Sequence, residues 1–257
     1  MQRYFVEPEC MSERTVRLVR EDAHHLIRVM RCGPGDEFIC SDGRSREVLA
    51  RVVRVEKESV HAEVVRELPM DREPAVDVWI AQSLPKGDKL ETVIQKCTEL
   101  GAVRFIPFVS ERTIVQYDEK KESKRLERWR RIAKEAAEQC HRNRVPVVES
   151  PWTWARLMEE VATGGLSIFC YEQEDGSGLR SILDEALGRM GKNKRTASDK
   201  RVLVIVGPEG GFSPREAGEA VQTGCRSANL GKRILRTETA AMAALTCILY
   251  HTGEMGG

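Results

Sequence analysis

The chain has 257 residues, which suits one large domain or a small domain joined to a larger one. With 41% hydrophobic and 32% charged residues, its composition is that of a globular protein and excludes collagen-like and disordered chains. The net charge of +1, from 41 basic and 40 acidic residues, excludes the strongly basic overall charge of many nucleic-acid-binding domains.

The amino-terminal segment and the cysteines predict a cytoplasmic protein. Residues Met1 to Pro8 contain acids and a proline where a signal peptide requires an apolar run, and no stretch approaches the roughly 20 apolar residues of a membrane span. The eight cysteines include no Cys-x-x-Cys pair, and a chain of this size folds without disulfides. We therefore expect neither a zinc site nor a catalytic thiol.

Basic residues gather in two segments. Between Arg112 and Arg144, eleven basic residues stand against six acidic ones, and a second basic run lies at Arg189 to Arg201. Such runs are typical either of a solvated helix face or loop, or of a surface that contacts phosphates. Charge alone leaves both interpretations open.

The first 72 residues predict a small β-domain. One helical segment, Glu21 to Met30, interrupts several short β-rich segments, which favour a barrel because closing a sheet removes its exposed edges. Leu68 to Pro74, with two prolines and alternating charges, is typical of a linker, so we place the domain boundary between residues 72 and 73. The predicted strands are Arg3–Val6, Val16–Val19, Glu37–Cys40, Val48–Val55 and Val60–Val65.

After Pro74 the pattern changes to alternating strands and helices. Asp88 and Glu91 resemble a capping box that opens a helix ending at Gly101, and a long helix is expected around Lys121 to Cys140. The strands lack polar alternation, as in a parallel sheet covered on both faces, so we predict an α/β domain. These strands are Val76–Ala81, Val103–Phe108, Val145–Val148, Leu166–Tyr171 and Val202–Val206.

A glycine turn follows the last of these strands. Gly207-Pro208-Glu209-Gly210-Gly211-Phe212 leads into a helix that Ser213, Pro214 and Glu216 open as a capping box. Ligands bind at the carboxyl ends of strands in open α/β sheets, and Gly210 and Gly211 would allow backbone to approach one. The turn matches neither the dinucleotide nor the P-loop fingerprint, and a purely structural turn is the alternative.

A second glycine-bearing segment, Leu230 to Thr239, leads into the apolar helix Ala240 to Tyr250. We expect Thr237 or Thr239 to cap this helix, whose amino terminus would favour a carboxylate or a phosphate. A simple cap beside a surface charge at Arg236 would fit the same residues.

Together the two segments closely resemble the signature motifs of the 16S ribosomal RNA uridine N3-methyltransferase family, in the SPOUT superfamily. The resemblance covers nearly the whole chain in the same order. The other matching blocks are Leu84–Lys89, Gln95–Gly101, Glu138–Cys140 followed by Val145-Pro146, and His24–Arg31 with Gly35-Asp36.

The resemblance implies a PUA-like RNA-binding barrel at residues 1–72 and an α/β methyltransferase domain at residues 73–257. It further implies a trefoil knot in the carboxy-terminal part of that domain and a homodimer that builds the active site. The expected methyl donor is S-adenosylmethionine, and the expected acceptor is N3 of uridine 1498 in 16S ribosomal RNA of the small subunit. No metal is expected.

The resemblance also assigns cofactor-binding residues to three loops. The cofactor would lie among the end of a strand, the glycine turn and the segment 230–240, with Leu230, Ile234 and Leu235 around the adenine. The expected residues are Phe169, Cys170, Tyr171, Gly207, Glu209, Gly210, Gly211, Leu230, Gly231, Ile234, Leu235, Thr237, Thr239 and Ala240.

For catalysis, N3 of uracil lies on the Watson–Crick edge and carries a proton, so the base must be unpaired and deprotonated. We expect Arg236 to stabilise the uracil oxygen that gains charge, and Glu238 or Glu209 to orient the base or accept the proton. RNA would contact a groove that the two predicted domains share. Its expected residues are Arg3, His24, His25, Arg28, Arg31, Lys86, Arg112 and Arg142, with Arg144 as the alternative to Arg142.

Two other functions fit parts of the sequence. A noncatalytic RNA-binding protein would use the barrel and the basic helix, but it would not need two glycine-bearing loops beside a helix amino terminus. A nucleotide-dependent enzyme is disfavoured by the missing phosphate-binding fingerprints. Binding of S-adenosylmethionine would distinguish the methyltransferase from both.

Overall fold

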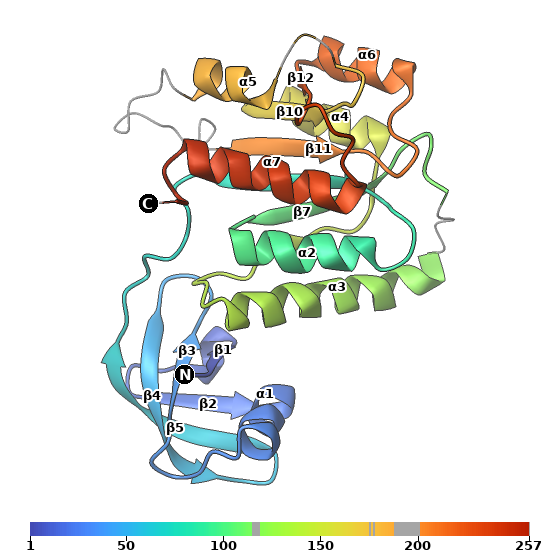
Figure 1. The fold of residues 1–257 in the computed structure, drawn as a ribbon. Coiled ribbons are helices and arrows are strands. Elements are labelled where there is room, and N and C mark those ends of the chain that lie inside the picture. Colours follow the sequence, from blue (N-terminus) through green and yellow to red (C-terminus); the bar gives the residue numbers. More distant parts are fainter. Residues whose placement is uncertain (115–118, 175, 177, 188–200, 257) are drawn as a thin grey trace. The chain divides into compact units, whose positions relative to one another are not determined.

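The computed structural model describes residues 1–114, 119–174, 176, 178–187 and 201–256, and the chain divides into two compact units (Figure 1). The first unit combines Met1–Glu73 with Lys134–Val145, and the second combines Pro74–Ala133 with Pro146–Gly257. The first division falls one residue from the boundary expected at 72. The sequence did not indicate that 134–145 would pack with the amino-terminal strands, and residues 188–200 of the second basic run lie outside the described residues.

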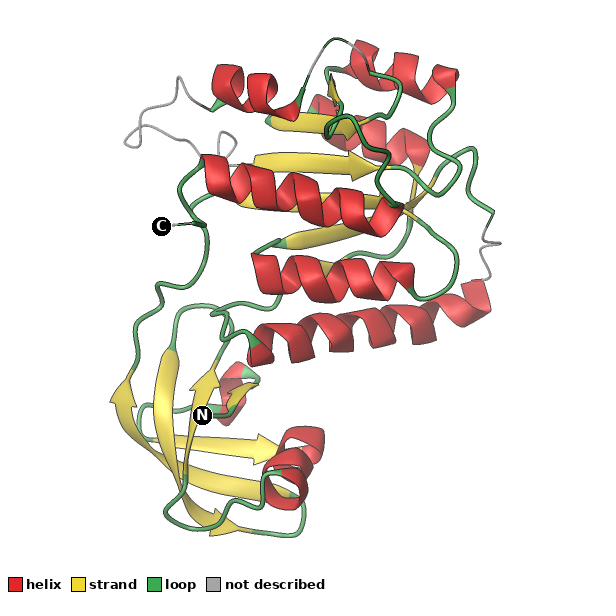
Figure 2. Ribbon diagram, viewed as in Figure 1, coloured by secondary structure: helices red, strands yellow, loops and turns green. Residues whose placement is uncertain are grey.

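The first unit is a curled five-stranded sheet (Figure 2). Strand order is β1-β3-β4-β5-β2, with β1 and β3 parallel and the remaining pairs antiparallel. All five predicted strands are confirmed, with ends shifted by at most two residues. Their bounds are β1 Arg3–Phe5, β2 Thr15–Val19, β3 Glu37–Ser41, β4 Glu47–Val55 and β5 Ser59–Glu67.

The helix predicted at Glu21–Met30 is divided in the structure. It consists of α1, Arg20–His24, and a π-helical turn η2, His25–Val29; a short 3-10 turn η1, Pro8–Cys10, precedes β2. The Met30 N–H donates to the His25 carbonyl at 3.0 Å, a five-residue spacing that periodicity in the sequence does not reveal.

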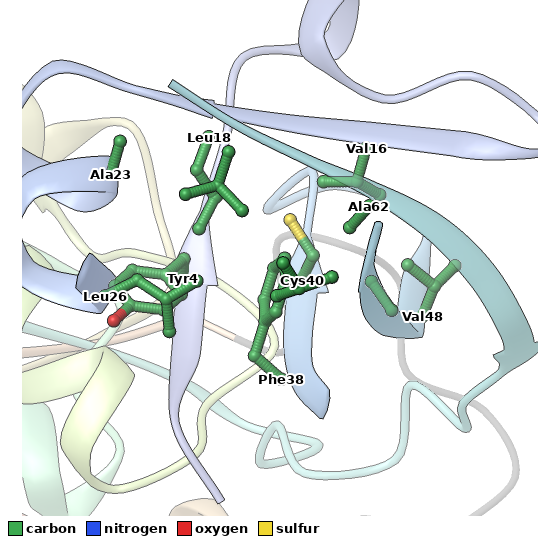
Figure 3. Packing of buried hydrophobic residues seen from close by; sticks show 12 residues of the cluster. Tyr4, Val16, Leu18, Ala23, Leu26, Phe38, Cys40, Val48 and Ala62 are labelled. Atoms are coloured by element: carbon green, nitrogen blue, oxygen red, sulfur yellow. The ribbon is translucent and has the colours of Figure 1, made fainter. Parts of the chain in front are cut away.

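The core of this unit forms from alternate residues of the strands (Figure 3). Val16 and Leu18 of β2 and Phe38 and Cys40 of β3 are buried on the inner face, since successive side chains of a strand point to opposite sides. The Tyr4 ring packs edge-on against Phe38 with ring centroids 5.9 Å apart. Leu26 contributes from η2, so the helical segment covers this core.

The carboxy-terminal end of α3, Glu119–Gln139, belongs to the first unit and brings a largely buried acid to β1. The Glu138 carboxylate accepts a hydrogen bond from the Phe5 N–H at 3.0 Å, and the Lys134 ammonium lies 3.7 Å away. Lys134 is shared, because it also pairs with Asp22 at 2.8 Å. Burial raises the pKa of Glu138 to about 7, since the attraction of Lys134 only partly offsets the loss of water.

This raised pKa predicts a specific dependence of stability on pH. Between the ordinary pKa of 4.5 and about 7, the folded state binds the Glu138 proton more tightly than the unfolded chain does. The free energy of unfolding should therefore fall as the pH rises through this range, by about 2 to 3 kcal/mol. Glu138→Gln, which cannot ionise, should remove that fall in denaturant titrations at about pH 5 and about pH 8. The control is Glu127→Gln on the exposed face of α3, and an unchanged pH slope in Glu138→Gln would contradict the prediction.

The second unit is built on a sheet of seven parallel strands (Figure 1). Strand order is β12-β10-β11-β6-β7-β8, and β9 also pairs with β7. The five predicted strands are confirmed, whereas β9 and β12 were missed because they have only two and three residues. The bounds are β6 Asp77–Ser83, β7 Arg104–Val109, β8 Val147–Val148, β9 Trp152–Thr153, β10 Leu166–Cys170, β11 Arg201–Val206 and β12 Arg226–Ala228.

Helices cover both faces of this sheet. On one face α7 packs on α2, β6 and β11, while α4 and α6 pack on each other and against β7 and β12. Leu203 and Ile205 of β11 join one core cluster with Leu157 of α4 and Ala220 of α6. The bounds are α2 Lys89–Leu100, α4 Trp154–Ala162, α5 Leu179–Ala186, α6 Pro214–Thr223 and α7 Thr237–His251. Within the described ranges, no helix is both long enough and apolar enough to span a membrane.

The capping box predicted at Asp88 and Glu91 is wrong. Asp88 does precede α2, but its side chain makes no capping hydrogen bond and its backbone is not extended (φ −95°, ψ 11°). The Glu91 carboxylate instead accepts a hydrogen bond from Arg128 at 2.6 Å. The end of the same helix is as predicted, with Gly101 in the left-handed conformation.

Candidate functional site

A pocket of about 450 Å³ opens at the carboxyl edge of the sheet, where β10, β11 and β12 end and α7 begins. Because all these strands are parallel, their following loops converge at the same edge. The three loops are residues 171 and 172 after β10, the glycine turn after β11, and the segment 229–237 between β12 and α7. The lining residues are Lys89, Cys170, Tyr171, Glu172, Val206–Glu209, Gly211, Phe212, Ala228–Thr237 and Ala240.

A buried hydrogen-bonded junction holds these two loops together. The Thr237 hydroxyl donates to the Gly207 carbonyl at 2.6 Å and accepts from the Gln82 amide at 2.8 Å. The Gln82 amide also reaches the Gly207 carbonyl at 3.3 Å. The prediction that Thr237 or Thr239 caps α7 is therefore wrong: Arg236 is the N-cap residue without a side-chain bond, and the Thr237 hydroxyl binds across to the glycine turn.

The capping box of α6 is confirmed, and it also anchors the loop after β7. The Ser213 hydroxyl accepts from the Glu216 N–H at 3.2 Å, while the Glu216 carboxylate accepts from the Ser213 N–H at 2.9 Å. Glu216 is fully buried and also accepts from the Glu111 N–H at 2.8 Å. The neighbouring Arg112 donates to the Gly210 carbonyl at 2.8 Å, so this loop braces the outside of the glycine turn.

The charged groups of the pocket are unequally paired. Glu209 accepts from the Lys89 ammonium at 2.6 Å and from the Lys86 N–H at 3.1 Å. Burial alone would raise the pKa of Glu209, but these hydrogen bonds outweigh it and lower the pKa. Among the described residues, three exposed cations of the lining form no ion pair. They are Lys232, Arg233 and Arg236.

Most residues that the sequence assigned to a cofactor do line this pocket. Phe169 does not: it is fully buried in the core, with its ring centroid 4.2 Å from that of Phe212. Gly210 and Thr239 also lie outside the lining. Ile234, expected beside the adenine, is 89% exposed at the rim. Cys170 is buried, which raises the pKa of its thiol to about 12 and leaves it an apolar wall residue.

Of the three expected catalytic residues, two line the pocket and one does not. Glu209 and Arg236 line the pocket, whereas Glu238 does not. Glu238 is half-buried on α7, and its buried Oε2 atom has no hydrogen-bond partner in the described part of the chain. The lowered pKa of Glu209 keeps it ionised and makes it a weak proton acceptor, so its geometry favours an orienting role.

Sequence reasoning missed one acid of the pocket, Glu172. It lies two residues beyond the end of β10, so its place at the carboxyl end of a strand was the available signal. Lys89, Asn229, Lys232 and Arg233 were also not assigned, although the last three lie inside or beside a segment that was.

Two arginines expected to contact RNA are instead buried within the first unit. Arg3 is 1% exposed and forms an ion pair with Glu47, and Arg142 is 4% exposed and pairs with Glu73 at 2.5 Å. Asn143 completes this buried network, since its amide donates to Glu47 at 2.7 Å. Arg3 joins β1 to β4, while Arg142 and Asn143 hold the residues after α3 against Glu73 and β4. Burial removes both guanidinium groups from any RNA surface.

The remaining expected RNA residues are accessible to different degrees. His25 is half-buried and its Nδ1 lies 2.8 Å from the hydroxyl of Tyr4, a residue of the core of the first unit. The side chains of the others are exposed. In the first unit these are His24, Arg28 and Arg31, and in the second unit Lys86 and Arg112.

Across the described ranges, no group of three or more His, Cys, Asp or Glu residues is placed to hold a metal ion. The pocket at the sheet edge is therefore lined by glycine backbone, apolar side chains and charged side chains. Its size is that of sites for small organic ligands.

Comparison with known proteins gives the class. A model of the RNA methyltransferase domain matches residues 72–249, and a model of the RNA methyltransferase PUA domain matches residues 19–65. Ribosomal RNA small subunit methyltransferase E of Bacillus subtilis is 38% identical, and the match covers 100% of this chain and 99% of that protein.

Solved structures agree over the whole chain. A ribosomal RNA small subunit methyltransferase E from Neisseria gonorrhoeae, bound to S-adenosyl methionine, is 31% identical with a TM-score of 0.83, covering 97% of each chain. A methyltransferase from Legionella pneumophila, also in complex with this cofactor, is 29% identical with a TM-score of 0.83 and the same coverage. The protein is thus an α/β RNA methyltransferase with a PUA domain. It belongs to the family of ribosomal RNA small subunit methyltransferase E.

The two glycines of the turn should respond differently to substitution. Gly211 has φ +65°, and a Cβ there would lie 2.5 Å from a Glu172 oxygen; Gly210 has no such φ, and its Cβ would make an ordinary 3.5 Å contact with Arg112. Gly211→Ala should lower the free energy of unfolding by about 1 to 2 kcal/mol. Gly210→Ala should change it by less than about 0.5 kcal/mol. Denaturant titration of both variants measures this, and equal effects would contradict it.

Proposed function

We propose that this chain transfers a methyl group from S-adenosylmethionine to N3 of uridine 1498 in 16S ribosomal RNA of the small subunit. The observation that carries the proposal is the pocket at the sheet edge, in which the glycine turn and the segment before α7 meet. Relatives with this fold bind the same cofactor. The family motifs that imply uridine N3 are those that line the pocket.

The residues present fit this methyl donor. Leu230, Leu235 and Ala240 provide apolar surface for an adenine, and Gly207 and Gly211 line the pocket without a side chain that would obstruct it. The cofactor, when bound, supplies an activated methyl group on a sulfonium. The chain contributes a fixed position for that group, because alignment of nitrogen, carbon and sulfur provides much of the rate.

The acceptor determines what the side chains must do. N3 is on the pairing edge of uracil, so the base enters the pocket unpaired and loses its N3 proton before or during transfer. Arg236, exposed in the lining and without an ion pair among the described residues, stabilises the uracil oxygen that gains negative charge. Glu209, ionised and held by Lys89, orients the base. Glu238 remains the alternative proton acceptor, since its buried Oε2 atom has no hydrogen-bond partner among the described residues.

RNA contacts come from exposed cations of both units. The PUA domain match includes His24, Arg28 and Arg31, and Lys86 and Arg112 flank the glycine turn. Lys232 and Arg233 add two exposed positive charges to the pocket lining, neither of them in an ion pair with the described residues. Distributed positive charge suits a large folded RNA that is recognised through its backbone and shape.

The same proposal includes a homodimer, a trefoil knot in the carboxy-terminal part and a cytoplasmic location. Support for the homodimer comes from α7, which has no charged residue between Thr239 and Tyr250 and exposes Thr246, Cys247 and 69% of Tyr250. An uncharged exposed helix face is typical of a surface that another chain covers.

The test is methylation of small ribosomal subunits that lack the modification. Purified protein and methyl-labelled S-adenosylmethionine should label the 16S RNA at one uridine, and reverse transcription should stop there because an N3-methyl group blocks pairing. Labelled RNA with the mark at another atom or position would contradict the specific acceptor. Binding of RNA without labelling and without cofactor binding would favour the noncatalytic alternative.

Substitution of Arg236 tests its assigned role. Arg236→Ala should lower the single-turnover methylation rate by about 100-fold or more, since one donor to a developing oxyanion contributes roughly that factor. Cofactor affinity should change little, because the role concerns the base. Arg180→Ala, which removes an arginine side chain that is 94% exposed on α5, should leave both quantities unchanged. An unchanged rate in Arg236→Ala with intact cofactor binding would show that the role is wrong.

A further inference from the structure

The two acids of the pocket differ in how their charge is compensated. Glu209 has Lys89 at 2.6 Å and the Lys86 N–H at 3.1 Å. The Glu172 carboxylate makes no hydrogen bond and no ion pair with the described residues, although Lys232 and Arg233 line the same pocket. A carboxylate without a donor in a ligand pocket leaves its acceptor capacity for the ligand.

The exposed side chain of Glu172 lies against the glycine turn. Its Oε1 atom lies 2.5 Å from the place that a Cβ of Gly211 would occupy, and Oε2 lies 3.3 Å from it. The carboxylate therefore occupies space that only a glycine at 211 leaves open. Two pocket loops, the one after β10 and the one after β11, thus bring an acid and bare backbone to the same spot.

We propose that Glu172 is a cofactor-binding residue that determines affinity for the methyl donor. Its carboxylate receives a donor or cationic group of S-adenosylmethionine. This inference rests on the function proposed above. The cofactor offers three groups of that chemistry, namely the ribose hydroxyls, the α-ammonium and the sulfonium. The last is present only before methyl transfer, so a contact there would favour the donor over its product.

The experiment is calorimetric titration of wild type and Glu172→Gln with three ligands. S-adenosylmethionine has all three groups, S-adenosylhomocysteine lacks the sulfonium charge, and methylthioadenosine retains only the ribose hydroxyls. Glu172→Gln preserves size and removes the charge, so the affinity for every ligand that uses the contact should fall about 10-fold or more. Glu159→Gln, an equal charge change at an exposed position on α4, is the control and should change none of the affinities.

The pattern of losses assigns the contact. Equal losses for all three ligands assign the ribose hydroxyls, losses for the first two assign the ammonium, and a loss for S-adenosylmethionine alone assigns the sulfonium. Glu172→Asp, which keeps the charge but shortens the side chain, should retain more affinity than Glu172→Gln. Wild-type affinities in Glu172→Gln for all three ligands would overturn the role of Glu172 while leaving the proposed function intact. A wild type that binds none of them, with or without RNA, would overturn both.

Discussion

The hydrogen bond from the Thr237 hydroxyl to the Gly207 carbonyl is the contact on which the pocket depends. It joins the first residue of α7 to the turn after β11, and Gln82 of β6 donates to both partners. All three residues are buried, where an unmade hydrogen bond costs the full desolvation of its polar groups. These buried hydrogen bonds therefore hold the two loops that wall the pocket. The charged side chains that face the pocket are not needed for that purpose.

The charged side chains of the pocket also differ in whether they have a partner. Glu209 is neutralised by Lys89 and kept ionised, which suits a group that positions a ligand. Arg236 and Glu172 are left without charged partners among the described residues, one positive and one negative. A pocket with both signs of uncompensated charge fits the reaction proposed above, in which a cationic methyl donor meets a base that becomes anionic.

In the first unit, by contrast, several charged side chains form buried ion pairs that hold the fold together. Arg3 and Arg142 are buried against Glu47 and Glu73, and Asn143 links the network to the strands. Such buried pairs are costly to break, so they fix the residues after α3 in one place. Glu138 adds a largely buried acid beside β1, and its pKa is raised because Lys134 only partly offsets its burial. The cations proposed above to contact RNA are exposed side chains outside this buried network.

The sequence by itself determined most helices and strands and the glycine turn of the pocket. Apolar strands, the capping box at Ser213 and the glycine turn depend on neighbours in the chain, so their pattern predicts them. Tertiary structure alone decided which polar groups are used internally. Thr237 binds Gly207 instead of capping its helix, Arg3 is buried, and Glu172 shares its space with Gly211. Each of these outcomes depends on a partner from a distant segment, and local spacing carries no information about such partners.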